Sequence, residues 1–439
     1  MSQIKEEGLK RELGIWDVIT NVLSISIGSG IFLLPALVYA ILGHASILAY
    51  LLCGVIFLCL GLCFGEVSSR IEDTGGVYVY IERAFGPLAG FVANILYWFG
   101  VGVMACGALL NALADIAASF FPIFETFGAR LTLFSLILGI ITFLSIKGIK
   151  DSMILIRTLT FLKVTALVGL VIFGFSFVDQ VNLSWEGWPK FNQLGEASLL
   201  LIFAFLGGEL SLSVSGELKN PKRTAPLGFI IGIIGVVLVF CSLHLVVQGV
   251  LGEALIANQE APLAQLAKTI SGKLGFTLIL IVSFIAVWST FSSIFLLKSR
   301  IVFAAAIDGL LPDIFSKLHP RYGTPVFGIL FLAVLDLVFA ASGSFRYLLI
   351  LVTAASIVVY VGVILAFFKF RIKEKVRSEK VFYAPAGYVL GSFALVALGW
   401  IFFQLAQNEL VAVGLFIVFL AILYYILNYF KISKKKEID

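Results

Sequence analysis

Charged residues are scarce in this chain: Asp, Glu, Lys and Arg make up 13% of its 439 residues, whereas 60% are hydrophobic. Soluble domains carry about 25% charged residues, because their surface has to be built from polar groups. The composition therefore excludes a soluble enzyme, a nucleic-acid-binding protein and a disordered scaffold. The net charge of +5 indicates a nucleic-acid partner only if the basic residues cluster on one surface.

Cysteine and histidine are also few. The five cysteines lie inside apolar runs, which is typical of small buried side chains and not of a disulfide framework. There is no Cys-x-x-Cys pair and the three histidines are far apart, so we expect no metal site. No stretch resembles a hydrolytic triad, a phosphate-binding loop or a nucleotide-binding domain. We therefore expect neither an enzyme nor an ATP-driven pump, and no cofactor.

Long apolar runs fill most of the sequence. A hydrocarbon core about 30 Å thick requires about 20 apolar residues in a helix. By that measure we predict twelve transmembrane helices, joined by polar connections too short to hold a soluble domain. The apolar run after the polar residues 1–14 is too long for a signal peptide and is kept as the first span. The expected starts are near Ile15, Ser46, Pro87, Thr126, Met153, Ser198, Leu227, Leu274, Thr324, Tyr347, Gly387 and Leu410.

The basic residues predict how these spans are oriented. With a cytoplasmic N-terminus and a change of side at every span, 24 of the 31 lysines and arginines face the cytoplasm. Only five face the other side, and Arg157 and Lys163 remain inside the fifth span. This asymmetry is a strong positive-inside signal. It predicts that the N-tail (residues 1–14) and the C-tail (residues 431–439) are both cytoplasmic.

Glycines interrupt the first and the sixth span at corresponding positions. The first span carries Gly28-Ser29-Gly30 at its middle, and the sixth carries Gly207-Gly208. Paired interruptions in two halves of a chain indicate a binding site at the bilayer midplane, where unwound helix ends attract anions and cations. An amino acid zwitterion carries both charges. The alternative is that these glycines only allow neighbouring helices to pack closely.

Lys163 is the most deeply placed cation of the sequence. The fifth span starts near Met153, which puts Lys163 about 15 Å inside the bilayer at 1.5 Å per residue. A lysine at that depth cannot reach the interface, whereas Arg157 can, and it is a candidate functional residue for that reason. We predict a titrating proton-coupling site, and the alternative is a permanent structural cation that bonds unwound carbonyls.

Two acidic residues are candidates for gating or coupling. Glu209 follows the break of the sixth span. Three roles are open for it there: gating of the substrate site, coupling to Lys163, or contact with a cationic substrate. Its structural alternative is a protonated carboxyl that bonds a neighbouring helix. Glu66 lies near the cytoplasmic end of the second span. Asp115 and Asp336 are expected at the membrane interface.

Short motifs follow one another in a specific order along nearly the whole chain. They are Gly28-Ser29-Gly30-Ile31-Phe32 with Pro35; Glu66, Gly75-Gly76, Tyr78, Tyr80, Phe85-Gly86-Pro87 and Trp98; Phe203-Ala204-Phe205 with Gly207 and Glu209; Lys219-Asn220-Pro221-Lys222-Arg223 and Pro226; and Ser299-Arg300, Asp308-Gly309-Leu310-Leu311-Pro312, His319-Pro320-Arg321 and Gly323-Thr324-Pro325. In this order they resemble the amino acid–polyamine–organocation (APC) superfamily of permeases, especially its bacterial amino acid transporters.

The resemblance implies an all-α integral membrane fold with broken helices 1 and 6. Residues 15–178 and 198–370 would form two inverted five-helix repeats, and residues 387–430 two further spans. It also implies alternating access around a site between spans one, three, six and eight. Lys163 matches a lysine that stands in proton-coupled members where sodium binds in others. Its ammonium would bond carbonyls near Gly28 and hydroxyls of the eighth span such as Ser292 or Ser293.

The substrate site that follows from these breaks uses backbone and apolar groups. Amides of Ser29 and Gly30 would hold the carboxylate, and carbonyls near Ser26, Phe203 and Leu206 the ammonium. Phe203, Phe205 and Ile294 would shape the side-chain pocket. The residues assigned to substrate binding are Ser26, Gly28, Ser29, Gly30, Phe203, Ala204, Phe205, Leu206, Gly207 and Ile294.

We therefore predict proton-coupled uptake of a neutral amino acid across the bacterial inner membrane. The alternatives are an obligatory exchanger, with cationic substrates allowed by Glu209, and a nutrient receptor that does not transport. Related arginine and polyamine exchangers lack the lysine and carry an aromatic where this chain has Ile294. Animal relatives attach a partner through a cysteine after the third span; Phe120 to Arg130 contain none, so no disulfide-linked subunit is expected.

Overall fold

The computed structural model describes residues 11–28, 30–71, 73, 75–257, 261–342, 345–374 and 381–436. At residues 33, 151, 203, 345–351 and 429–436 it describes the backbone alone. Nearly all of the described chain is helical, and its one β-type pairing within these ranges is an isolated bridge between Leu13 and Leu218.

The helices follow one another with short connections. In the first half they are α1 (Ile15–Ser26), α2 (Gly30–Leu42), η1 (Gly43–Ser46), α3 (Ile47–Arg70), α4 (Val77–Phe85), α5 (Pro87–Ile95), η2 (Leu96–Val103), α6 (Met104–Phe120), η3 (Pro122–Glu125), α7 (Phe127–Lys147) and α8 (Ile149–Phe175). In the second half they are η4 (Gln180–Leu183), α9 (Phe191–Phe205), η5 (Gly208–Glu217), α10 (Pro221–Leu251), α11 (Ala254–Ala257), α12 (Pro262–Ile307), η6 (Asp313–Ser316), α13 (Val326–Ser342), α14 (Phe345–Lys373), α15 (Gly387–Phe402) and α16 (Gln407–Lys436).

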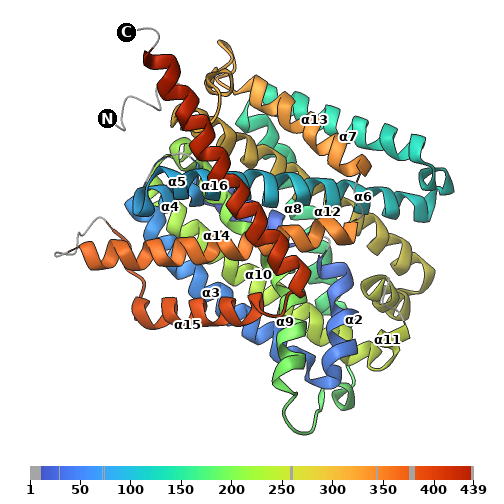
Figure 1. Ribbon diagram of the computed structural model, residues 1–439. Coiled ribbons are helices and arrows are strands. Elements are labelled where there is room, and N and C mark those ends of the chain that lie inside the picture. The colour runs from blue at the N-terminus through green and yellow to red at the C-terminus, as the bar shows by residue number, and fades with distance from the viewer. Residues whose placement is uncertain are drawn as a thin grey trace.

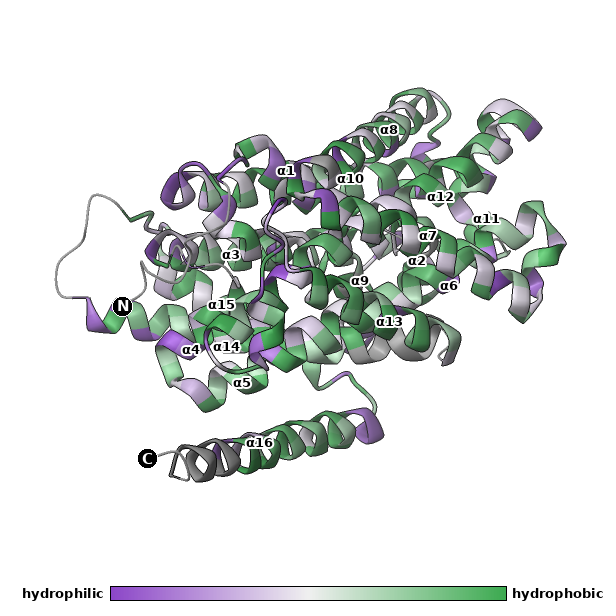
Figure 2. Cartoon of the chain, turned by 90° about the horizontal axis from the view of Figure 1, so that it is seen from above, coloured by the Kyte–Doolittle hydropathy of each residue, from purple (hydrophilic) through white to green (hydrophobic). Residues whose placement is uncertain are grey.

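Eight of the helical stretches in the described ranges are long and apolar enough to cross a bilayer. They cover α3 with part of α2, α5 to α6, α7, α8, α10, α12, α14 and α16. Shorter apolar helices are α1, α13 and α15. Most residues of these helices are hydrophobic (Figure 2), and with eight apolar stretches of spanning length in the described ranges the chain is a multi-pass membrane protein.

Broken helices occupy the centre of the bundle. Helix α10 packs along α3 and α1, and α12 packs along α8 and α6. The half-helices α2 and α9 lie side by side near the end of the bundle where α11 is found (Figure 1). Helix α16 crosses the outside of the bundle and contacts it mainly through α5 and α14.

The third apolar stretch is not a regular α-helix. Between α5 and α6 the backbone widens into a π-helix, η2, over Leu96–Val103. π-Helical turns are rare and are frequently found next to functional sites. Here the wider turn brings Tyr97 and Val101 toward the centre of the bundle, and Gly100 approaches α14 so closely that an added Cβ would lie 2.9 Å from that of Ala355.

Candidate functional site

The first helix breaks at the glycine motif. Helix α1 ends at Ser26, Ile27 has a non-helical backbone (φ −83°, ψ 67°), and α2 begins at Gly30. The break leaves carbonyls at the end of α1 and amides at the start of α2 without helical partners. One of these carbonyls, that of Ser26, accepts the amide of Gly28 at 2.9 Å. The predicted interruption is confirmed, while Ser29 lies outside the described residues.

The second break has the same character. Helix α9 ends at Phe205, and Gly207 adopts a left-handed backbone (φ 91°) before the 3₁₀-helix η5. The amide of Gly207 donates to the hydroxyl of Tyr360 at 3.4 Å. In a continuous helix that amide would bond the Phe203 carbonyl, so the turn frees this carbonyl at the end of α9.

The two breaks lie against each other. A Cβ added to Gly30 would be 3.1 Å from the Cβ of Ala204, and one added to Gly207 would be 2.6 Å from Ile25 Cγ2. The glycines are therefore needed both for the backbone turns and for the close approach of the half-helices.

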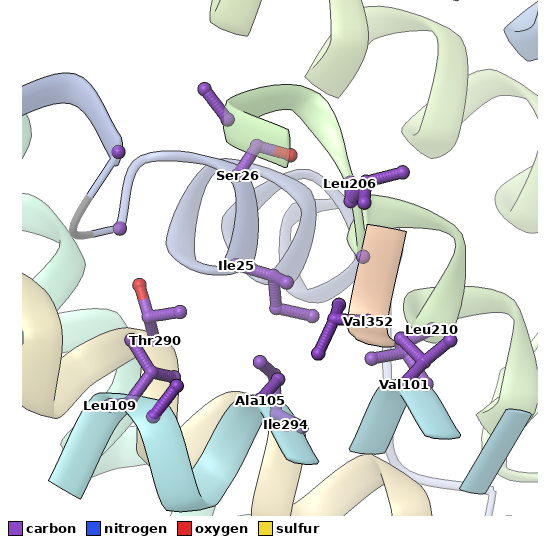
Figure 3. A pocket seen from close by; sticks show the side chains of 15 residues that line it. Ile25, Ser26, Val101, Ala105, Leu109, Leu206, Leu210, Thr290, Ile294 and Val352 are labelled. Carbon is purple, nitrogen blue, oxygen red and sulfur yellow. The ribbon is translucent and has the colours of Figure 1, made fainter. Parts of the chain in front are cut away.

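A small cavity of about 40 Å³ lies between the breaks. Figure 3 shows the side chains of Ile25, Ala105, Ile294 and Val352 converging on it. Its lining is apolar apart from Ser26 and Thr290, and it has room for about three water molecules. The site is thus contracted, and an amino acid needs the surrounding helices to move apart.

Most of the residues predicted for this site line the cavity: Ser26, Gly28, Gly30, Ala204, Leu206, Gly207 and Ile294. Phe205 does not. Its ring is buried against Phe57 (centroids 5.0 Å apart) and Phe240 (4.8 Å), on the opposite side of α9. Of Phe203 the structure describes the backbone alone.

The sequence reasoning missed half of the lining. These residues are Ile25, Val101, Ala105, Ala108, Leu109, Leu210, Thr290 and Val352. Four of them come from η2 and α6, the third apolar stretch. The small side chains of Ala105 and Ala108 were the available signal, but alanine is common throughout the sequence.

Lys163 joins the first break to α12. It is fully buried on α8, and its Nζ donates to the carbonyls of Ser24 and Ile27, each at 2.7 Å. Thr290 Oγ1 lies 3.4 Å from the same Nζ and donates to the Ser24 carbonyl at 2.5 Å. The ammonium thus caps the end of α1, where a cation is favoured by the orphaned carbonyls. Carbonyl contacts next to Gly28 agree with the prediction, but the hydroxyl comes from Thr290 and not from Ser292 or Ser293.

A chain of hydroxyls extends this contact. Ser24 Oγ lies 2.7 Å from Ser289 Oγ and accepts from Ser293 Oγ at 2.8 Å. Thr160 Oγ1 on α8 lies 3.1 Å from the Ser289 hydroxyl. Helices α1, α8 and α12 are therefore tied together by one buried polar network around Lys163.

Glu209 is buried but lies outside the cavity lining. Tyr360 donates to its Oε2 at 2.5 Å, and the hydroxyl of Tyr97 lies 3.5 Å from Oε1. The carboxyl thus links the start of η5 to α14 and to η2. None of the hydrogen bonds found in the described ranges joins it to Lys163.

Glu66 belongs to a separate network at the end of α3. It is fully buried and bonds Arg371 of α14 through both carboxylate oxygens, Arg70 at 2.6 Å and the amide of Ala384 at 2.8 Å. Arg70 also bonds Glu374 at 2.7 Å. The network fastens α3 to α14 and to the segment before α15.

Further ion pairs join helices around the site. Asp336 was expected at the interface, yet both it and Lys298 are fully buried, with Nζ 2.5 and 2.6 Å from the carboxylate oxygens. The expectation was wrong because Asp336 faces α12 and not the end of its own helix. Arg300 bonds Glu217 at the end of η5, at 3.0 Å. Asp17 of α1 pairs with Arg157 of α8.

Known proteins resemble this chain over most of its length. It is 27% identical over 421 residues to the serine/threonine exchanger SteT of Bacillus subtilis, which covers 92% of each chain. It is 25% identical to the branched-chain amino acid permease BcaP of the same organism over 436 residues, or 90% of each chain. It is also 25% identical to a methylthioribose transporter of that organism over 349 residues, 74% of this chain and 73% of the other.

Residues 13–428 match the family described as amino acid permease. The match includes both breaks, Lys163 and every residue of the cavity. The motifs that resembled the APC superfamily lie inside it as well. The chain therefore belongs to the amino acid permease family of the APC superfamily, whose members are transporters and not enzymes.

Proposed function

We propose that the protein is a secondary active transporter that imports neutral amino acids together with protons by alternating access. The observation that carries this proposal is the meeting of two broken helices at one cavity, with Lys163 buried beside the first break. A carboxylate fits the amides at the start of α2, and an ammonium fits the carbonyls at the end of α9.

The walls of the cavity support a neutral substrate. Apart from Ser26 and Thr290 its side chains are apolar or absent, and Glu209 is held outside it by Tyr360. A cationic side chain would find no charged partner in this lining. The names of two relatives, a serine/threonine exchanger and a branched-chain permease, also refer to neutral amino acids.

Lys163 is the proposed coupling group. Its charged form holds two carbonyls of the first break and shares Thr290 with α12. Loss of the proton removes the charge that these carbonyls stabilise and loosens α1 from α12. Protonation would thus favour one orientation of the bundle and proton release the other.

The proposed membrane arrangement has twelve spans. The broken pairs α1–α2 and α9–η5 would each act as one span, and each would begin an inverted repeat, over residues 15–178 and 198–370. Helices α15 and α16 would add two spans. The distribution of basic residues supports cytoplasmic termini, and the motifs support a location in the bacterial inner membrane.

Exchange is the second candidate function, because a relative that spans 92% of the chain is named an exchanger. In that case Lys163 would be a fixed cation, and transport would require an amino acid on both sides. A receptor that binds without transport is the remaining alternative.

One experiment separates these functions. The protein is reconstituted in liposomes, and uptake of labelled serine, leucine and arginine is measured under proton or sodium gradients, with and without amino acid inside. Proton symport predicts accumulation driven by an inward proton gradient, which Lys163→Ala abolishes. Lys150→Ala, an exposed lysine on the same helix, is the matched control and should transport normally.

Each rival function has its own result. Uptake that strictly requires internal amino acid would support exchange, and binding without flux would support a receptor. If Lys163→Ala keeps full proton-driven accumulation, the proposed coupling role is wrong.

A further inference from the structure

We propose that a phospholipid acyl chain binds in a second cavity, behind the substrate site, and braces the π-helix η2. This cavity has a volume of about 200 Å³ and lies between η2, α14 and α16. Its lining is entirely apolar: Leu96, Phe99, Gly100, Met104, Ala355, Ala412, Val413 and Phe416.

The second cavity and the substrate cavity share their walls. On η2, Val101 lines the substrate cavity and its neighbour Gly100 lines the second one. On α14, Val352 and Ala355 face the two cavities in the same way. π-Helical turns are frequently found at functional sites, and this one has the substrate cavity on one side and the second cavity on the other. Whatever fills the second cavity therefore presses on the back of the substrate site.

The outer wall of the second cavity faces the bilayer. Helix α16 lies apart from the other helices along one side of the bundle (Figure 2). Its residues Val411, Leu415 and Val418 are 54%, 65% and 56% exposed, and Ala412 in the cavity wall is exposed as well. Ala412 therefore belongs both to the cavity wall and to the exposed surface of α16, the part of the wall that an acyl chain of the bilayer can reach.

An acyl chain is the occupant that this chemistry selects. When an apolar cavity of this size is empty, the side chains that line it lose van der Waals contacts, and they offer no polar group that would hold water. Bilayer acyl chains are the apolar groups present at this depth. Met104 has a flexible side chain and Phe416 a flat ring, and both pack well against an alkyl chain.

Occupancy would couple to substrate binding. A chain in the second cavity holds η2 against the substrate cavity, where Val101 contacts the substrate space. Loss of the chain lets η2 relax outward and weakens substrate affinity. This part of the inference rests on the proposed function, whereas the presence of the acyl chain does not.

Photolabelling tests the presence of the chain. The protein is reconstituted with phosphatidylcholine that carries a diazirine on one acyl chain, and labelled peptides are identified by mass spectrometry. Labels are expected in 96–104 and 412–416. Ala412→Trp places an indole in the volume that the acyl chain would take, so labelling of 96–104 should fall about tenfold, which corresponds to about 1.4 kcal/mol of lost binding. Leu415→Trp on the exposed face is the matched control and should label like the unaltered protein.

Delipidation tests the coupling. Removal of lipid by detergent should weaken amino acid binding in the unaltered protein and in Leu415→Trp. In Ala412→Trp the indole replaces the acyl chain, so binding should no longer depend on lipid. Ala412→Phe serves in the same role if the tryptophan variant does not fold, as judged by its unfolding temperature. Equal labelling of 96–104 in the Ala412 and Leu415 variants would overturn the proposal, whatever the transport assay shows.

Discussion

Replacement of Thr290 by valine tests how the first break is held. The change keeps the shape of the side chain and removes a hydroxyl that bonds the Ser24 carbonyl at 2.5 Å and lies 3.4 Å from Lys163 Nζ. A buried hydrogen bond contributes about 0.5–1.5 kcal/mol net, and about 1.5–3 kcal/mol when one partner is charged, as Lys163 is. A loss of about 2 kcal/mol changes a population ratio roughly thirtyfold, at 1.4 kcal/mol for each tenfold step.

The variant should therefore release α1 from α12 more often. Hydrogen exchange of the amides in α1 reports this opening, because local exchange follows the free energy of local separation. We expect exchange in Thr290→Val to be roughly thirtyfold faster at the end of α1. Ser292→Ala is the matched control, since the Ser292 hydroxyl has no hydrogen-bond partner within the described part of the chain. Equal exchange in the two variants would refute the role given to Thr290.

Three further variants test the packing around the site. Lys298→Ala leaves Asp336 buried without its partner and should cost about 3–5 kcal/mol, seen as a lower unfolding temperature that replacement of both residues by leucine largely restores. Ala108→Leu narrows the substrate cavity, so leucine uptake should fall about tenfold or more while alanine uptake persists. Gly100→Ala should destabilise the protein by about 1–3 kcal/mol because its Cβ would lie 2.9 Å from that of Ala355, and Ala355→Gly should rescue it.

The helix breaks and the buried lysine could be predicted because each carries a local signal. Glycine pairs in the middle of an apolar run disfavour a continuous helix, and the distance of Lys163 from the start of its span sets its depth. The contacts of Lys163 with carbonyls near Gly28 required the family resemblance as well. The spacing of residues alone says nothing of which helices meet.

The side of each helix that faces the cavity could not be predicted. Successive residues of an α-helix point about 100° apart, so Ala204 lines the cavity while Phe205 points away toward Phe57. The same ambiguity explains why Thr290, and not Ser292, reaches the ammonium. No sequence signal distinguishes the π-helix η2 from the α-helices that flank it.

The pairing of distant charges was also beyond the sequence. Lys298 and Asp336 are 38 residues apart on different helices. Their pairing depends on how far α12 and α13 are displaced along each other, which the sequence does not state. Considered separately, each of these charged residues is expected at the membrane interface. Together they form a buried pair, which a membrane interior tolerates only when the charges meet.

The central claim is that an amino acid binds between the two broken helices. An experimental density map of the protein with a bound neutral amino acid tests it most directly. We expect the carboxylate at the start of α2, near Gly30, the ammonium at the end of α9, and the side chain against Ala105 and Ile294. Density for the amino acid elsewhere, or continuous helices through Gly28 and Gly207, would contradict the account.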